Sequence, residues 1–258
     1  LNLTENTQPV MLAAGYATYK VLSEETNLSP VSMAGHSLGE YTALVASNFI
    51  NFYDAIGLVR KRGELMQSAV PSGEGSMAAI LGLDDAVIIE ICQKANNKGV
   101  VEAVNFNSPG QVVIAGEKNA VANACELMKE AGAKRALVLP VSVPSHCSLM
   151  KEAATKFKTY IDSIDFKIGN VKVIHNVDAD YAGDIESIKA KLVEQLHMPV
   201  LWTDSVNKMK ESGIEKLIEV GPGKVLAGLT RRIDKSLSAS AIIDVSSLKS
   251  TIEEISNA

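Results

Sequence analysis

One stretch of the sequence decides the fold: residues 30–40, which read PVSMAGHSLGE. Its first half starts with a proline and is short and mostly apolar, which predicts a buried strand. Residues 38–46 are then apolar at helical spacing, which predicts a helix. A Gly-x-Ser-x-Gly sequence between a strand and a helix is typical of a nucleophile elbow, the sharp turn that exposes a reactive serine. The sequence therefore predicts that Ser37 is a catalytic nucleophile.

The residues around Ser37 fit this geometry. A side chain larger than hydrogen at Gly35 or Gly39 is expected to collide with the turn. Ser37 would also lie at a helix N-terminus, where unpaired N–H groups and the helix dipole stabilise a developing negative charge. We expect the N–H of Leu38 to be the first donor to such an oxyanion. The alternative is a glycine-rich turn with an ordinary serine, which the flanking strand and helix disfavour.

The composition is that of an ordinary globular protein, with one large domain or a core and a smaller companion. Of the 258 residues, 47% are hydrophobic and 21% are charged, which is enough to bury a substantial core. The net charge of −5 argues against nucleic acid as the main partner, and no apolar run approaches the length of a membrane span. Three cysteines without paired spacing indicate reduced thiols in the cytoplasm and no metal site: Cys92, Cys125 and Cys147.

A second pattern begins after the break at residues 71–75, PSGEG. It has the order strand-helix-strand-strand-helix-strand, which is typical of a ferredoxin-like domain. We expect these elements at 76–81, 84–95, 100–105, 111–115, 119–131 and 135–141. The pattern predicts a small domain, residues 73–141, inserted into a large core made of residues 1–72 and 142–258.

The large core has alternating helices and strands, which predicts a parallel sheet covered on both faces. We expect a loop at residues 1–7 and then a helix, with Pro9 near its first turn. The expected helices are 10–22, 38–46, 52–67, 148–164, 185–196, 202–212 and 225–233, and the expected strands are 30–34, 171–177, 217–220 and 241–245. Together with the elbow, this predicts an α/β-hydrolase-like core.

A serine nucleophile needs a base, and the sequence offers four histidines. His146 lies in a proline-containing loop after a strand, where catalytic groups are commonly placed. His36 adjoins the serine and is expected to point to the opposite face and pack beside the pocket. His175 lies in a predicted strand, where a hydrogen-bonded core histidine is the simpler interpretation. His197 falls at a helix end, where capping the last carbonyls explains it.

An esterase-type triad would add a carboxylate that orients the histidine. Four aspartates are available, and the sequence does not select among them: Asp178, Asp180, Asp204 and Asp244.

Several motifs resemble one known family. GHSLGEY, residues 35–41, resembles the active-site signature of malonyl-CoA:acyl carrier protein transacylases and related acyltransferase domains of fatty-acid and polyketide synthases. Further segments that resemble the family are RGELMQ at 62–67, VPSHC at 143–147, QLHMPV at 195–200 and GPG at 221–223. The resemblance runs through nearly the whole chain.

The resemblance assigns roles to individual residues. It implies that His146 is the catalytic base and that the backbone carbonyl of Gln195 orients its ring. It also implies that Arg62 binds the malonyl carboxylate, to which a planar, permanently charged guanidinium is well suited. Taken alone, an arginine in the run Arg60-Lys61-Arg62 is more often part of a solvated helix face. The remaining candidates for the pocket are Gln8, His36, Asn107 and Asn105, although an asparagine that forms a turn explains the last two equally well.

The function implied is transfer of a malonyl group from malonyl-CoA to the phosphopantetheine thiol of acyl carrier protein, for fatty acid biosynthesis. The acyl group would rest on Ser37 between the two steps, and no metal or redox cofactor would be needed. An acidic carrier protein would require a local basic patch, for which Arg231, Arg232 and Lys235 are candidates. The alternatives are a serine esterase or thioesterase of the α/β-hydrolase type, and a catalytically inactive docking fragment.

One feature departs from the family. Its members begin with a strand that ends in a GQGSQ loop, whose backbone supplies a second oxyanion donor, and this sequence starts after that point. We therefore expect the N-terminal core strand to be absent from the chain as given, with half of the oxyanion hole.

Overall fold

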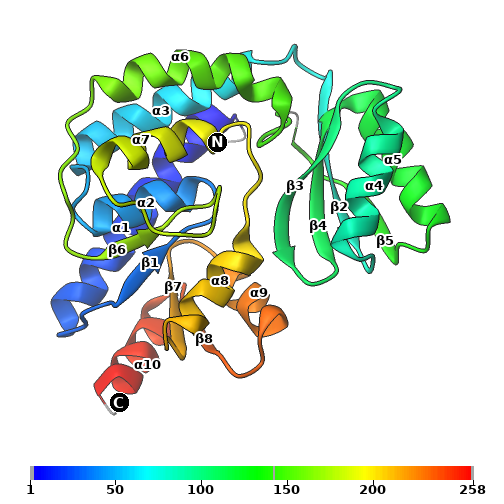
Figure 1. Cartoon of the computed structure of the whole chain (residues 1–258). Coiled ribbons are helices and arrows are strands. Elements are labelled where there is room, and N and C mark those ends of the chain that lie inside the picture. Colours follow the sequence, from blue (N-terminus) through cyan, green and yellow to red (C-terminus); the bar gives the residue numbers. More distant parts are fainter. Residues whose placement is uncertain (1–2, 142, 257–258) are drawn as a thin grey trace.

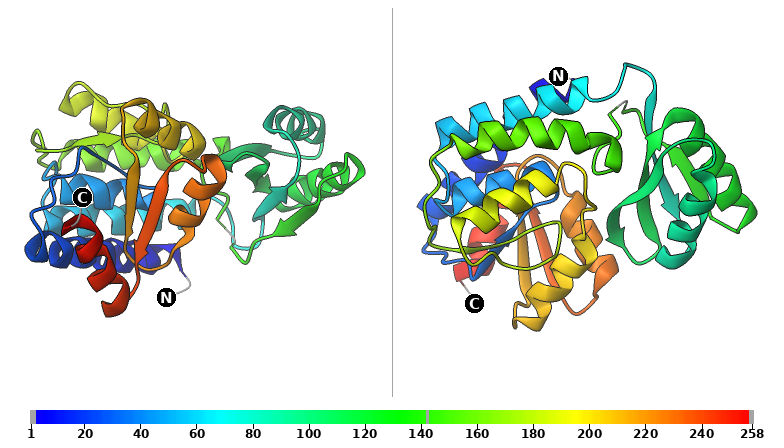
Figure 2. Two further views of the ribbon diagram at one scale, coloured as in Figure 1. Left: turned by 90° about the horizontal axis from the view of Figure 1, so that it is seen from below. Right: turned by 45° about the horizontal axis from the view of Figure 1, so that its top comes forward.

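The computed structural model describes residues 3–141 and 143–256, so the expected domain boundary at residue 142 lies outside the described residues. Helices and strands form a large unit and, beside it, a smaller four-stranded unit (Figures 1 and 2). The α/β class is therefore confirmed. The large unit contains α1 (Thr4–Glu25), β1 (Ser32–Ala34), α2 (Leu38–Ala46), α3 (Phe52–Ser68), η1 (Ser148–Met150), α6 (Lys151–Asp162), β6 (Lys172–Ile174), α7 (Ile185–Glu194), α8 (Trp202–Glu211), β7 (Lys216–Val220), α9 (Val225–Ile233), β8 (Ser238–Ile242) and α10 (Val245–Ser256).

The smaller unit is made of consecutive residues. Its elements are β2 (Gly75–Leu81), α4 (Asp85–Ala95), β3 (Val101–Ser108), β4 (Gln111–Glu117), α5 (Lys118–Glu130) and β5 (Arg135–Val138). All strand pairs in it are antiparallel, in the order β3-β4-β2-β5. Its helices cover one face of the sheet, where alternate strand residues such as Ile80 and Ile114 pack in a separate apolar core. The opposite face packs on the large unit through Met77, Val113 and Cys147.

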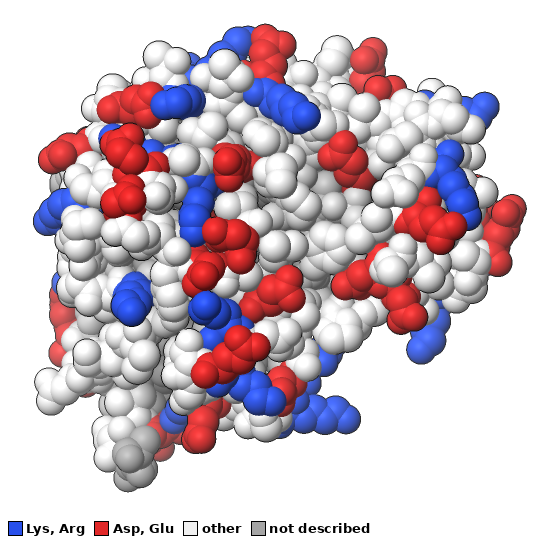
Figure 3. Space-filling view, viewed as in Figure 1, with Lys and Arg blue, Asp and Glu red and all other residues white. Residues whose placement is uncertain are grey.

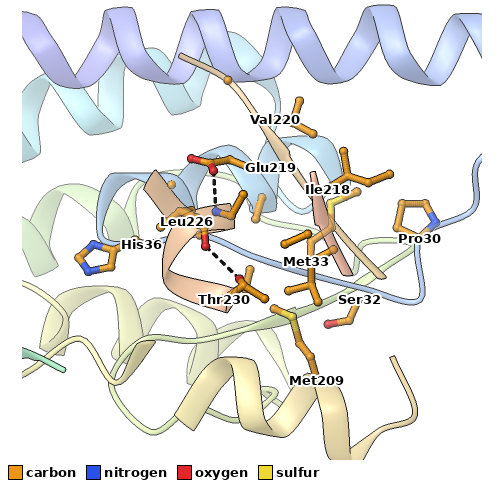
Figure 4. A pocket seen from close by; sticks show the side chains of 18 of the residues that line it. Pro30, Ser32, Met33, His36, Met209, Ile218, Glu219, Val220, Leu226 and Thr230 are labelled. Carbon is orange, nitrogen blue, oxygen red and sulfur yellow. Dashed lines mark hydrogen bonds between the residues drawn. The ribbon is translucent and has the colours of Figure 1, made fainter. Parts of the chain in front are cut away.

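The strands of the large unit do not form the single parallel sheet that the sequence predicts. β1 pairs with β6 and β7 pairs with β8, both in parallel, and these are separate two-stranded sheets. A cavity of about 840 Å³ is lined by β1 on one side and β7 on the other. Figure 4 shows Met33 of β1 and Ile218 of β7 among the side chains that line it. Within residues 3–141 and 143–256, no further strand pairs with either two-stranded sheet.

The chain ends of the large unit also differ from the sequence prediction. The expected loop at residues 1–7 is wrong from Thr4 onward, because α1 begins there and packs against α3. Gly63 of α3 permits a close approach, since a Cβ there would lie 2.6 Å from Glu5 Cα. The last strand lies at 238–242 and a helix, α10, follows it, which the sequence analysis missed. Asp244 caps the start of that helix, because its carboxylate accepts a hydrogen bond from the Ser247 N–H at 2.7 Å. An aspartate at such a position is a sequence signal for a helix N-terminus.

Candidate active site

The elbow forms as the sequence predicts, between β1 and α2. Ser37 has φ 51° and ψ −106°, a backbone conformation that side-chain-bearing residues rarely adopt. A Cβ at Gly35 would lie 1.9 Å from the carbonyl carbon of Gly39, so only glycine fits there. The expected collision at Gly39 is wrong, because a Cβ at that position meets nothing within 4 Å. Of the two glycines in this turn, Gly35 is therefore the one that the close approach of the backbone requires.

His146 reaches the serine from the other side of the large unit. Its Nε2 lies 2.8 Å from Ser37 Oγ, and its backbone N–H donates to Leu196 O at 3.0 Å. Burial, reinforced by the positive charge of Arg62, lowers the pKa of His146 to about 3. The imidazole is therefore neutral at ordinary pH, the state in which it can accept the serine proton.

A backbone carbonyl fixes the tautomer of that imidazole. His146 Nδ1 lies 2.6 Å from Gln195 O. Because a carbonyl only accepts, Nδ1 carries the proton and Nε2 faces Ser37 with its lone pair. None of the four candidate aspartates fills this position. Asp178 pairs with Lys191, Asp180 pairs with Lys208 and Asp244 caps α10.

Arg62 lies beneath the same serine, although its neighbours in sequence lie on the surface. Its Nη2 donates to Ser37 Oγ at 3.1 Å and to Gln195 Oε1 at 2.9 Å, and its Nη1 donates to Gln8 Oε1 at 2.7 Å. The guanidinium also lies over the Tyr41 ring, with Cζ 5.3 Å from the centroid, and is 1% exposed. Burial lowers the pKa of Arg62. By contrast, Arg60 is exposed and Lys61 is half-buried, and both pair with Glu64.

Arg62 retains a free donor. Its Nε is buried and has no acceptor among the residues that the structure describes. Gln8, which the sequence analysis linked only weakly to the pocket, is buried and holds the guanidinium from α1. Among the described residues no carboxylate forms an ion pair with Arg62, although the charge of buried Glu40 acts on it. A buried guanidinium with a free donor beside a serine hydroxyl is suited to an anionic group.

The smaller unit reaches the site through one side chain. Asn107 Oδ1 of β3 lies 2.8 Å from His36 Nε2, and the His36 ring packs on Trp202 at a centroid distance of 5.8 Å. Burial lowers the pKa of His36. β3 is held there by the chain near Val200, because Val200 N–H donates to Val104 O and Phe106 N–H donates to Val200 O. Asn105 is buried on the same strand, but its Oδ1 has no partner in the described part of the chain.

Leu38 is placed to stabilise an oxyanion. It is the first residue of α2, and its N–H has no acceptor in the described ranges 3–141 and 143–256. An unpaired N–H at a helix N-terminus, next to the nucleophile, is the donor that a tetrahedral intermediate requires.

Two functional candidates were missed by sequence reasoning. Asn176 Oδ1 accepts the Ser37 N–H at 2.7 Å, and Glu40 of α2 is fully buried below it. A charged residue in the apolar run 38–46 was the available signal for Glu40.

His175 is a hydrogen-bonded core histidine, as interpreted from the sequence, with Nδ1 2.7 Å from Glu40 Oε1. The sequence predicts that the His197 side chain caps the helix end. Its Nδ1 does not do so, because that atom has no hydrogen-bond partner among the described residues.

Other chemistry is poorly supported by the described residues. Cys147 adjoins His146, but burial raises the pKa of its thiol to about 12, and Sγ donates to Pro144 O. Cys92 and Cys125 are also buried and unpaired. Within the described ranges, no group of three or more His, Cys, Asp or Glu residues could hold a metal ion, and no helix is long and apolar enough to cross a membrane.

The surface carries charges of both signs. Figure 3 shows Lys and Arg interspersed with Asp and Glu over the face it presents. Within the candidate basic patch, Arg231 donates to Ala239 O and Arg232 donates to Gln111 Oε1, which joins α9 to the smaller unit. Lys235 is exposed close by in the chain.

Comparisons with known proteins agree with one another. The family model described as "Acyl transferase domain" matches residues 1–251. The malonyl CoA-acyl carrier protein transacylase of Escherichia coli K12 is 53% identical over 253 residues, which cover 98% of this chain and 82% of that protein. The Bacillus subtilis 168 protein of the same name is 45% identical over 256 residues, 99% of this chain and 80% of that one.

Solved structures show the same similarity. An acyl-carrier-protein S-malonyltransferase from Burkholderia pseudomallei has a TM-score of 0.96 at 51% identity, covering 98% of this chain and 82% of that one. A malonyl-transacylase in complex with a type II polyketide synthase acyl-carrier protein has a TM-score of 0.97 at 50% identity, with the same shares covered.

Proposed function

The chain belongs to the acyl transferase domain family, and on that premise we propose that Ser37 carries the acyl group during the reaction. The protein is an acyltransferase that moves a malonyl group from malonyl-CoA to acyl carrier protein in fatty acid synthesis. One observation supports the assignment of Ser37 above the others. Its Oγ lies 2.8 Å from a neutral imidazole and 3.1 Å from a buried guanidinium.

The first half-reaction forms the acyl-enzyme. His146 Nε2 accepts the Ser37 proton while Oγ attacks the thioester carbon of malonyl-CoA. The Leu38 N–H donates to the oxyanion that forms on the carbonyl oxygen. When the C–S bond breaks, the CoA thiolate leaves with the proton that His146 held. Malonyl-Ser37 and neutral His146 remain.

The second half-reaction reverses these roles. The phosphopantetheine thiol of the carrier protein gives its proton to His146 Nε2, and its sulfur attacks the ester carbon of malonyl-Ser37. The C–O bond breaks, and Ser37 Oγ recovers the proton from His146. Both steps are acyl transfers between oxygen and sulfur with no change of oxidation state, so we propose that no cofactor takes part.

Arg62 confers selectivity for a dicarboxylic acyl group in this proposal. Its guanidinium is buried, has a free Nε and lies within reach of the acyl-bearing oxygen. The carboxylate of the malonyl group would supply the missing anionic partner, and a charge-assisted bond at a desolvated site is strong. Gln8 and the Gln195 side chain hold the guanidinium in place, and we propose that the bonded pair His36 and Asn107 lines the acyl pocket.

We also propose a finer description of the fold. The antiparallel β3-β4-β2-β5 order with two helices on one face supports a ferredoxin-like small domain at residues 73–141. The elbow between β1 and α2, with the two parallel pairs, supports an α/β-hydrolase-like core for the remainder. Three unpaired buried thiols support a cytoplasmic location.

Mass spectrometry tests the assignment of Ser37. Exposure to malonyl-CoA without carrier protein should release one CoA per protein and leave one malonyl adduct, mapped to Ser37 by peptide digestion. Ser37→Ala should carry no adduct, since the nearest rival, Cys147, is buried and protonated. An adduct on another residue would refute the assignment, and continuous release of free malonate would favour the hydrolase alternative.

A further inference from the structure

A buried polar cluster behind the elbow has no part in the proton transfers described above. It consists of Glu40, His175 and Asn176, which are 0%, 1% and 0% exposed. The large majority of polar groups buried this completely are paired, because an unpaired buried charge is strongly destabilising. The bonds of this cluster lead to the backbone of the elbow.

Asn176 holds the elbow on both sides of the strained turn. Its Oδ1 accepts the Ser37 N–H at 2.7 Å, and its Nδ2 donates to Gly35 O at 2.7 Å. One amide therefore fixes the peptide groups before and after His36, where Ser37 has its φ of 51°. The same bond occupies the Ser37 N–H, so the adjoining Leu38 N–H remains free for an oxyanion.

Glu40 holds Asn176 from the first turn of α2. Its Oε2 accepts the Asn176 backbone N–H at 3.0 Å and Gln195 Nε2 at 2.8 Å, and its Oε1 lies 2.7 Å from His175 Nδ1. Gln195 Nε2 also donates to Ser37 O at 3.0 Å. Three donors converge on one carboxylate, which fixes the segment at 175–176 and the Gln195 side chain relative to the elbow.

We propose that Asn176 is a positioning residue for acyl transfer, which sets the direction of Ser37 Oγ toward His146, and that Glu40 fixes Asn176. The inference rests on Ser37 being the nucleophile. It predicts an effect on the acylation step and not on recognition of the malonyl group, because Asn176 makes no direct bond to Arg62 or Gln8 among the described residues. Its link toward Arg62 is a 3.3 Å bond from Gln195 Nε2, which keeps two other acceptors, Ser37 O and Glu40 Oε2, when Asn176 is removed.

Single-turnover acylation of the full chain by malonyl-CoA tests this role. Asn176→Ala removes both elbow bonds, and a displacement of the nucleophile on the ångström scale lowers the rate by about 10- to 100-fold. The malonyl-CoA concentration that gives half the maximal rate should stay within about twofold, and the preference for malonyl over acetyl groups should not change. Glu40→Gln keeps the shape and loses at most one of the three bonds, because the His175 ring can change tautomer and accept from the new amide, so its rate should fall by less.

A matched control separates positioning from stability. Thr230→Ala removes the hydrogen bond of another buried side chain, from Thr230 Oγ1 to Leu226 O within α9, with no bond to the elbow or to Asn176 among the described residues. It should lower the melting temperature and leave the acylation rate unchanged. A wild-type acylation rate in Asn176→Ala, with a lower melting temperature, would show that the cluster only supports the fold. A changed half-saturation or malonyl preference would equally overturn the proposal.

The two proposals fail in different ways. If the wild-type protein forms no Ser37 adduct, the assignment of the nucleophile is wrong before any variant is compared. If Asn176→Ala does not fold, Asn176→Asp decides the matter, because it keeps the size of the side chain but loses the donor to Gly35 O, and an unchanged acylation rate in that variant would contradict the inference.

Discussion

The large unit and the four-stranded unit have separate apolar cores, yet all groups that contact Ser37 Oγ come from the large unit. They come from segments as far apart in sequence as α3 and the loop at 146. The four-stranded unit contributes one rim contact, between Asn107 and His36. Under the proposed function, the chemistry depends on the large unit, while the four-stranded unit contacts the site through Asn107.

The largest effect is expected at the base. His146→Ala should lower the rate of acylation by about 10⁴-fold or more, because no other described group within hydrogen-bonding distance of Ser37 Oγ can accept its proton. The measurement is CoA release in a single turnover. His197→Ala is the control, since that side chain does not contact the serine. A residual rate within tenfold of wild type would mean that a different base operates.

Arg62→Ala should have the next largest effect, and it should be selective. Loss of the charge-assisted pair is worth roughly 2–5 kcal/mol, or about 30- to 5,000-fold in malonyl transfer. Acetyl transfer lacks that pair and should fall far less. Arg60→Ala, which removes an exposed arginine two residues away, should leave both rates unchanged. Equal losses of malonyl and acetyl transfer in Arg62→Ala would show that Arg62 is structural.

Asn107→Ala tests the contribution of the four-stranded unit directly. It removes the partner of His36 Nε2, for which we expect a loss of less than about tenfold in kcat/KM, consistent with one hydrogen bond. A double-mutant cycle with His36→Ala should show a coupling of about 1 kcal/mol. A loss as large as that of His146→Ala would contradict the division of roles between the two units.

The smallest effect on rate is expected from mild acid. Because the pKa of His146 is lowered to about 3, the acylation rate should stay nearly constant between pH 7.5 and 5.5. An imidazole with an ordinary pKa near 6.5 would lose about tenfold at the lower pH. A tenfold decline would therefore show that His146 is not desolvated.

Stability should respond where the rate does not. A lowered histidine pKa means that the unfolded chain binds the proton first, so the unfolding free energy falls as pH drops below about 6.5. At pH 5.5 this group alone accounts for about 1.4 kcal/mol, and His36 acts in the same direction. Denaturant titrations of wild type and His146→Asn at both pH values measure the difference.

The four-stranded unit could be predicted almost entirely from sequence. Its six elements lie in chain order, and each has a local signal, such as the turn at Ser108-Pro109-Gly110 between β3 and β4. The large unit was predicted less well, because its strand pairing joins distant segments. No local pattern indicates that β1 would pair with β6 across 140 residues and leave its other edge facing a cavity.

The candidate site shows the same difference between residues with a local sequence signal and residues whose roles depend on distant contacts. Ser37 was recognisable from the turn itself, His146 was a candidate from its loop that the family motif strengthened, and Arg62 and Gln195 were indicated only through family motifs. Asn176 and Glu40 were missed, because their roles depend on a contact between residues 136 positions apart. The charge run Arg60-Lys61-Arg62 illustrates the limit, since helical periodicity alone does not show that its third member is 1% exposed.

The bond from His146 Nδ1 to Gln195 O has a consequence for genetics. The acceptor belongs to the main chain, so no codon change at position 195 deletes it. A saturation mutagenesis library would report on Gln195 only through its side chain, which contacts Arg62 and Glu40. The orienting acceptor would therefore be invisible to such a screen, and would appear only when the 195–196 amide is replaced by an ester through chemical synthesis, which weakens that carbonyl as an acceptor.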